Sequence, residues 1–270
     1  MSHHDLQRAL VVALHDPAFV AAMHVDPDAA LAPFRLAAAE RAQLLAVDPR
    51  AFAVDRLRGR RVLKAIAPEL RASMAIALAE TRSFAFADRF FSSAAFHGAI
   101  LRDQPLVLAL AHYLAGAGLA TPQLAGVLAI ERARAESRRD AARRPGPGLA
   151  VAPGIRLLAT TTGALAALQT AEQHLFELSL LPHMALCDDR PLLTLPPPGG
   201  DSLYLVVRAG ELSDLPEPLF RTLHAIENAA TRGPVARADM VAILASINLR
   251  VPDPAQLAAD LLADAYLTEA

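Results

Sequence analysis

The stretch from Pro145 to Gly148, which reads Pro-Gly-Pro-Gly, constrains the fold more than any other segment of the sequence. These residues cannot continue a helix. Before this stretch, apolar residues recur at helical spacing, whereas short runs rich in β-branched residues come after it. We therefore predict an α+β protein in which a mainly helical domain, residues 1–146, precedes a small antiparallel-sheet-plus-helix domain, residues 147–270.

Asp-Pro pairs punctuate the first domain. Asp16-Pro17 and Asp26-Pro27 suit helix starts with aspartate as the N-cap and proline in the first turn, and a third pair, Asp48-Pro49, ends the next helical segment. Short helices of this kind indicate a compact, layered module. We expect longer amphipathic helices at residues 52–66, 68–82, 84–101, 104–116 and 121–143.

The second domain has a different pattern. Two short β-like runs flank Pro153-Gly154, a helix is expected over 164–180, and residues 190–215 favour a strand, a turn and a second strand. Three helical patterns follow, at residues 217–230, 236–247 and 254–265, and a terminal strand comes after them. This is the element order of a winged-helix fold. The domain is thus predicted to be winged-helix-like or peptide-recognition-like.

Composition narrows the classes of function. The formal net charge is −2, and the segment from residue 212 carries four arginines against eight acidic residues, which argues against nucleic acid as a partner. No run of about 18 apolar residues lacks charges, so we expect no membrane span. Cys187 is the only cysteine, so no disulfide can form within the chain. We expect a cytoplasmic protein.

Catalytic motifs are not found in the sequence. It contains no HExxH, GxSxG, P-loop or GxGxxG pattern, and its nine histidines do not form ligand sets apart from the His224/Glu227 pair. We therefore expect neither a catalytic residue nor a metal or cofactor in this chain. An enzyme of unrecognised type, with a site around His97 and Asp103, stays open as an alternative.

Residues 84–101 hold an unusual share of the aromatic side chains. On a helical wheel Phe86, Phe90 and His97 share one face, where a hydrogen-bonded core histidine is a more common role than a ligand. Phe84 and Phe91 fall on the opposite side, and must be covered by another helix or by another protein. Ser92-Ser93 can break the helix and rotate the residues after the break.

The alternation in residues 202–208 suits a β-strand covered on one face. At a sheet edge such a strand can accept an extended peptide through its backbone. An ordinary central strand is the alternative.

Several segments together resemble the small partner subunits of multinuclear non-haem iron-dependent oxidases that modify ribosomally made peptides, a family that includes the partner of the methanobactin oxidase. The resemblance rests on residues 48–73, 90–97, 131–145 and 149–166. It implies a non-catalytic subunit that forms a heterodimer with the oxidase, which holds the iron, and that recruits the leader of a precursor peptide. Peptide recognition is then expected in the C-terminal part, by strand addition to a sheet.

Mapped onto this sequence, the resemblance suggests two sets of site residues. The peptide-binding residues are Ser202, Leu203, Tyr204, Leu205, Val206, Val207 and Arg208. The oxidase-facing residues are Phe84, Phe91, Phe96 and His97. The alternative function is a winged-helix transcriptional regulator with a helical sensor domain.

Overall fold

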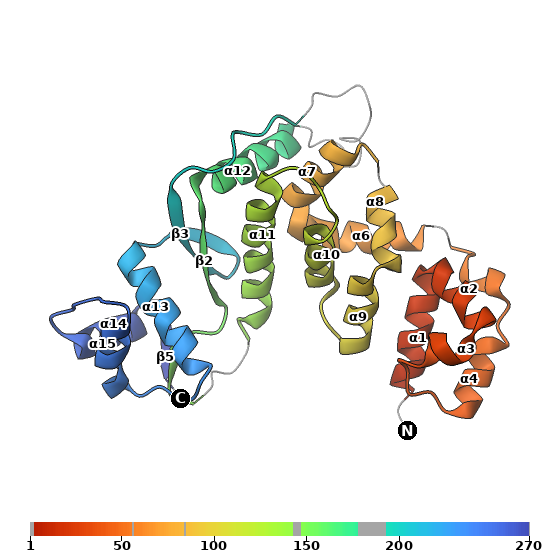
Figure 1. The fold of residues 1–270 in the computed structure, drawn as a ribbon, viewed down its shortest axis with the longest axis horizontal. Helices are drawn as coiled ribbons and strands as arrows, with labels where there is room; N and C mark the ends of the chain where they lie inside the picture. The colour runs from red at the N-terminus through yellow and green to blue at the C-terminus, as the bar shows by residue number, and fades with distance from the viewer. Residues whose placement is uncertain (1–2, 56, 84, 143–146, 178–192, 270) are drawn as a thin grey trace. The chain divides into compact units, whose positions relative to one another are not determined.

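The computed structural model describes residues 3–55, 57–83, 85–142, 147–177 and 193–269 (Figure 1). The protein is α+β and mainly helical, with a small antiparallel sheet. It divides into two compact units, of which the first comprises residues 1–124 and 171–194 and the second residues 125–170 and 195–270.

The first unit is built from short helices. They are α1 (His4–His15), α2 (Pro17–Val25), α3 (Pro27–Leu31), α4 (Ala38–Leu45), α5 (Pro49–Phe52), α6 (Arg58–Ile66), η1 (Ala67–Leu70), α7 (Arg71–Thr81), α8 (Ala85–Asp88), η2 (Arg89–Ser92), α9 (Ala94–Arg102) and α10 (Leu106–Ala115). One apolar core joins α1 to α5, and Phe19, Phe34 and Phe52 are among its buried side chains.

The three Asp-Pro pairs lie at the starts of helices, as predicted for the first two. The Asp16 side chain accepts a hydrogen bond from the backbone N–H of Ala18 at the start of α2, and Asp26 caps α3 in the same manner. Asp48 caps α5, where its carboxylate accepts from the N–H of Arg50. In each case a carboxylate satisfies a donor that the helix itself leaves free.

The predicted helix over 84–101 is broken in the structure. α8 gives way to the 3-10 turn η2, and Ser93 then adopts an extended conformation and caps α9 with its side chain. The cap resets the phase of the helix, so a single helical wheel cannot be drawn through Phe86 and His97 together.

The second unit contains the strands. Its elements are most of α11 (Gln123–Asp140), β1 (Leu149–Val151), β2 (Ile155–Thr161), the first part of α12 (Thr162–Glu177), β3 (Ser202–Arg208), β4 (Glu211–Asp214), α13 (Glu217–Ala230), η4 (Arg237–Asp239), α14 (Met240–Ser246), α15 (Pro254–Ala263) and β5 (Leu267–Glu269). One antiparallel sheet has the order β2-β3-β4, and β1 pairs with β5 in a separate antiparallel pair.

The long helix α11 belongs mostly to this second unit, although the sequence placed the domain boundary at residue 146. Its Ser137 hydroxyl donates to the carbonyl of Gly154, beside β2. Its Asp140 carboxylate pairs with Arg156 of β2. These contacts fix α11 against the strands that come after it in the chain.

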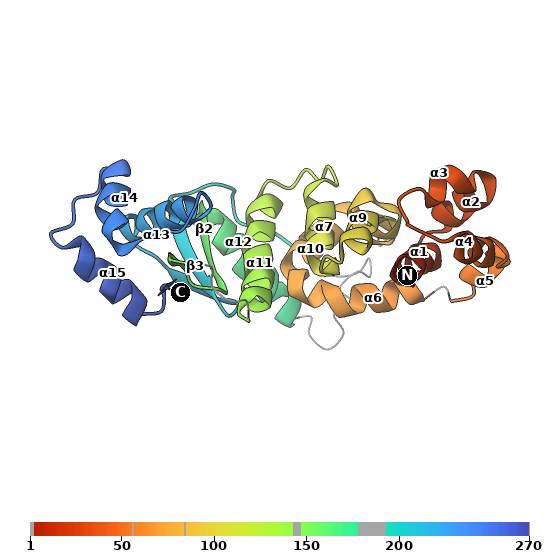
Figure 2. The same ribbon diagram turned by 90° about the horizontal axis from the view of Figure 1, so that it is seen from below.

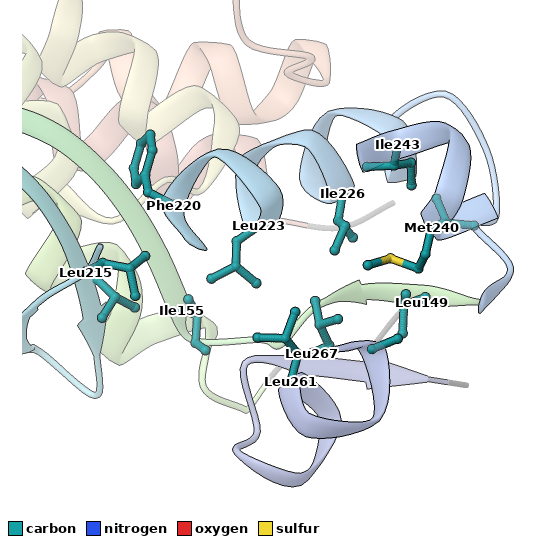
Figure 3. Packing of buried hydrophobic residues seen from close by; sticks show 13 residues of the cluster. Leu149, Ile155, Leu215, Phe220, Leu223, Ile226, Met240, Ile243, Leu261 and Leu267 are labelled. Carbon is teal, nitrogen blue, oxygen red and sulfur yellow. The ribbon is translucent and has the colours of Figure 1, made fainter. Parts of the chain in front are cut away.

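The three-stranded sheet is covered on both faces within the second unit. Ile155 points into a core shared with α13, α14 and α15 (Figure 3). Val206 belongs to the same buried cluster. Successive side chains of a strand point to opposite faces, so Leu205 and Val207, both buried, face the other way. In both ribbon views the sheet lies between α13 on one side and α11 on the other (Figures 1 and 2).

Candidate functional site

β3, which covers the residues predicted to bind a peptide, is the central strand of its sheet. β2 pairs with all seven residues from Ser202 to Arg208, and β4 pairs with Leu205 to Arg208. Of the two possibilities that the sequence left open for this strand, an edge strand and an ordinary central strand, the structure has the second. Most of its backbone groups are already bonded, so a peptide could add only to a different strand of the same sheet.

The register shows which backbone groups point out of the sheet. The N–H of Leu215 donates to the carbonyl of Tyr204 at 2.8 Å, so Tyr204 and every second residue after it on β3 bond toward β4. The intervening residues of β3 bond to Arg156, Leu158 and Thr160 of β2. The N–H and C=O groups of Leu157 and Ala159 consequently point away from the sheet.

The outer edge of β2 is open over its middle. No backbone hydrogen bond joins Leu157 or Ala159 to another element among the described residues. Ala159 is exposed and Leu157 and Leu158 are only half-buried, whereas the residues paired with them on β3 include the buried Leu205 and Val206. Unpaired groups beside half-buried leucines are the features that a strand-adding peptide requires.

The outer edge of β4 is a poorer acceptor. β4 has four residues against seven in β2, and Glu211 and Asp214 are both exposed on it. By the same register, Leu212 and Asp214 present the outward backbone groups. Charged side chains on a short strand protect an edge against further pairing. The candidate peptide site is therefore the outer edge of β2.

Sequence patterns gave little sign of this site. The strand β2 was expected, but pairing order depends on which chain segments meet in space, and no local pattern states it. One usable signal was the Ala209-Gly210 pair between β3 and β4. Both residues have positive φ, 52° and 87°, which identifies a two-residue hairpin turn. A hairpin makes β3 and β4 neighbours, so only the other side of β3 is left for pairing with a further strand.

Phe91 and Phe96, two of the residues predicted to face an oxidase, lie in the interior of the first unit. Phe91 is 4% exposed and Phe96 is buried as well, so neither can contact a partner protein in this fold. Their assignment to an interface is wrong. The wheel failed because the cap at Ser93 and the turn η2 redirect both side chains inward. Phe84 lies outside the described residues.

Other parts of the same unit cover Phe91. The rings of His15, Phe90 and Phe96 lie 5.2, 5.3 and 5.2 Å from it, centroid to centroid. On the side of α6, a Cβ built on Gly59 would come 2.9 Å from the Phe91 ring. Glycine thus allows the backbone of α6 to approach the ring directly.

His97 has a polar partner from the start of α2. Its Nε2 lies 3.0 Å from Asp16 Oδ2, without the alignment of a hydrogen bond, and 31% of its side chain is exposed. The hydroxyl of Ser92 donates to the other oxygen of the same buried carboxylate at 2.7 Å. Asp16 therefore joins a helix cap, a serine and a histidine in one cluster, a structural arrangement that ties α2 to α9.

His97 and Asp103 do not belong to one cluster. The Asp103 carboxylate pairs with His4 and Arg8 of α1. The hydrogen bonds from His4 and Arg8 hold the pKa of Asp103 below its usual value, which suits a carboxylate fixed in an ion pair. The alternative of an enzyme site formed by these two residues has no support in the geometry.

His15 is a titratable group whose pKa is lowered by burial. Loss of water lowers its pKa below the ordinary value of 6.5, while the hydrogen bond between Nδ1 and the carbonyl of Val11 opposes this shift. Its Nε2 has no hydrogen-bond partner among the described residues. The ring is stacked on Phe91, so it is part of the aromatic core.

Candidate metal ligands do not gather in the described part of the chain. No three His, Cys, Asp or Glu side chains in it lie close enough to hold one ion together. The His224 ring lies 3.5 Å from the carboxylate of Glu227, and both side chains are largely exposed. Cys187 lies outside the described residues.

No single helix among the described residues is long and apolar enough to cross a membrane. α1 and α2 together reach the required length and composition, but the chain bends by 116° between them.

Comparisons with known proteins gave no match: no protein-family model, no curated protein and no solved structure matches this chain.

Proposed function

We propose that this chain is a non-catalytic partner subunit of a multinuclear iron oxidase, and that it binds the leader of a ribosomally made precursor peptide. The observation that carries the proposal is the open outer edge of β2, with its outward backbone groups at Leu157 and Ala159. The resemblance of residues 48–73, 90–97, 131–145 and 149–166 to such subunits supports the same function. The irons of the oxidase would supply the oxidative chemistry.

The edge of β2 suggests what kind of peptide would bind. An added strand would form hydrogen bonds with Leu157 and Ala159, and its side chains would alternate between the two faces of the sheet. Leu157 on one face and Leu158 on the other are half-buried. A leader with apolar residues at alternate positions would complete the cover of at least one of these leucines, which adds hydrophobic stabilisation to the backbone bonds.

In this proposal the C-terminal helices support the sheet by packing against one of its faces. The order α13, α14, α15, β5 is that of a winged-helix-like fold, and Leu223, Ile226 and Leu261 from these helices are buried beneath β2 and β3 (Figure 3). The segment from residue 212 has a net charge of −4, which opposes contact with phosphates. We therefore favour a role in supporting the peptide site over the alternative of DNA binding, and we place the complex in the cytoplasm.

The function can be tested by reconstitution with the iron oxidase and the short precursor peptide encoded nearest to this chain. We expect the oxidase to co-purify with the chain as a heterodimer, and to modify the precursor much faster with it than alone. An oxidase that neither co-purifies nor gains activity would contradict the proposal. Salt-dependent binding to DNA upstream of these genes would instead favour the transcriptional regulator.

A further inference from the structure

One face of α6 carries exposed basic residues. Arg60, Arg61 and Lys64 come after Leu57 at the i, i+3, i+4 and i+7 spacing, so the four side chains lie on one side of the helix. All four are exposed. The opposite side of α6 packs inward through the buried Leu63 and through Gly59 beside the ring of Phe91.

Two of these cations form no ion pair within the part of the chain that the structure describes. Among the described residues neither Arg60 nor Lys64 forms an ion pair, whereas Arg61 pairs with Asp55. The hydrogen bond from Arg61 lowers the pKa of Asp55, whose carboxylate also accepts from the N–H of Leu57 before the first turn of α6. Asp55 thus holds the start of the helix, and the face as a whole stays positive.

Two apolar side chains extend the same surface. Leu57 is 56% exposed, and Val54, three residues before it, is 81% exposed. The described residues contain few large hydrophobic side chains that are this accessible, so two within four residues, beside uncompensated cations, are unusual.

We propose that this basic face of α6, formed by Leu57, Arg60, Arg61 and Lys64, is the surface that docks onto the oxidase, and that it fits an acidic, partly apolar patch there. The inference rests on the proposed function, since it names the partner from that function. Arginine is enriched in protein interfaces because its guanidinium can bind carboxylates in two-point contacts while its stem packs on apolar groups. Leu57 would supply the apolar contact at the centre of these charges.

Other anionic partners fit this face less well. A helix that lies on a membrane inserts its apolar side, but the apolar side of α6 is already packed against Phe91. Nucleic acid is bound through many phosphate contacts, whereas this face offers three cations on a chain with a net charge of −2. A partner protein can bind this face through a small surface patch whose charge is opposite to that of the three cations.

The test compares two variants and a matched control by their affinity for the oxidase. Arg60→Glu/Lys64→Glu reverses the two unpaired cations and leaves the Asp55–Arg61 pair intact. Leu57→Ser removes the apolar contact. Arg232→Glu/Arg250→Glu makes the same charge change at exposed arginines of the second unit that have no ion pair among the described residues.

We expect each α6 variant to bind the oxidase about tenfold more weakly, while its affinity for the leader peptide stays unchanged. The difference in oxidase affinity between the wild type and the charge variant should shrink as salt is added, because salt screens the interaction between charges. The difference between the wild type and Leu57→Ser should not shrink, because an apolar contact is not screened. The control should bind like the wild type.

Equal affinity of the wild type and both α6 variants would overturn the docking assignment, as would an equal loss in the control. If wild-type chain fails to bind the oxidase at all, the proposed function itself is wrong. Altered binding of the charge variant to anionic phospholipid vesicles, with oxidase affinity unchanged, would assign the face to a membrane instead.

Discussion

Replacing Phe91 with alanine removes a side chain that is 4% exposed and that contacts three other rings. Truncation of a buried phenylalanine costs about 3–5 kcal/mol, because the apolar contact is lost and the cavity closes only in part. Whole domains are stable by about 5–15 kcal/mol. We therefore expect Phe91→Ala to remove a large share of the stability of the first unit.

The assay is urea denaturation followed by far-UV circular dichroism, with hydrogen exchange of the amides in α6 and α9 to localise the effect. Phe176→Ala is the matched control, since it makes the same truncation at a side chain that is 72% exposed. The control should change the free energy of unfolding by less than about 0.5 kcal/mol.

A different result would restore the assignment of Phe91 to an interface. If Phe91→Ala has the stability and exchange pattern of the wild type but no longer binds the oxidase, the ring faces a partner, and its burial within this chain is not the native arrangement. If Phe91→Ala loses stability and Phe176→Ala does not, the aromatic cluster is part of the core.

Three further predictions concern contacts inside the two units. Gly59→Ala gains about 1 kcal/mol of helix propensity, but a Cβ placed 2.9 Å from the Phe91 ring forces a shift that costs about 1–3 kcal/mol; thermal denaturation should show a net loss, and Phe91→Leu should relieve it. His15→Phe keeps an aromatic ring against Phe91 and removes the titratable imidazole. Burial lowers the pKa of His15 in the folded protein, so the unfolded chain takes up the proton first as the pH falls. The stability of the wild type should therefore be full above pH 6.5 and fall below it. Urea midpoints between pH 5 and 8 should therefore vary less in the variant, and an equal slope in both proteins would contradict this. Gly163→Ala would place a Cβ 2.3 Å from the carbonyl oxygen of Gly199, a backbone atom that cannot turn away, so hydrogen exchange in β2 and α12 should accelerate; unchanged exchange would refute that contact.

Local signals in the sequence predicted much of the first unit. The Asp-Pro pairs at residues 16–17 and 26–27 marked helix starts because capping depends only on neighbouring residues. The burial of Phe91 could not be predicted, since it depends on the phase change at Ser93 and on the approach of α6 from a distant part of the chain.

The candidate site shows the same limit for strands. The alternation of residues 202–208 correctly indicated β3, but a strand with one covered face and a strand covered on both faces differ little in sequence here. Only the pairing of β2 and β4 with β3 decides which edge is open. The open edge therefore belongs to β2, at Leu157 and Ala159, and not to the strand on which the resemblance placed peptide binding.

The most direct measurement of the central claim is the affinity of a labelled leader peptide for wild-type chain, Ala159→Pro and Asp214→Pro. Each proline removes one outward N–H, at the edge of β2 and of β4 respectively, and leaves the ladder to β3 intact. We predict that Ala159→Pro weakens binding at least about tenfold, because a backbone bond is lost and the ring blocks the added strand, while Asp214→Pro binds like the wild type. Equal affinity of all three folded proteins would contradict strand addition at β2.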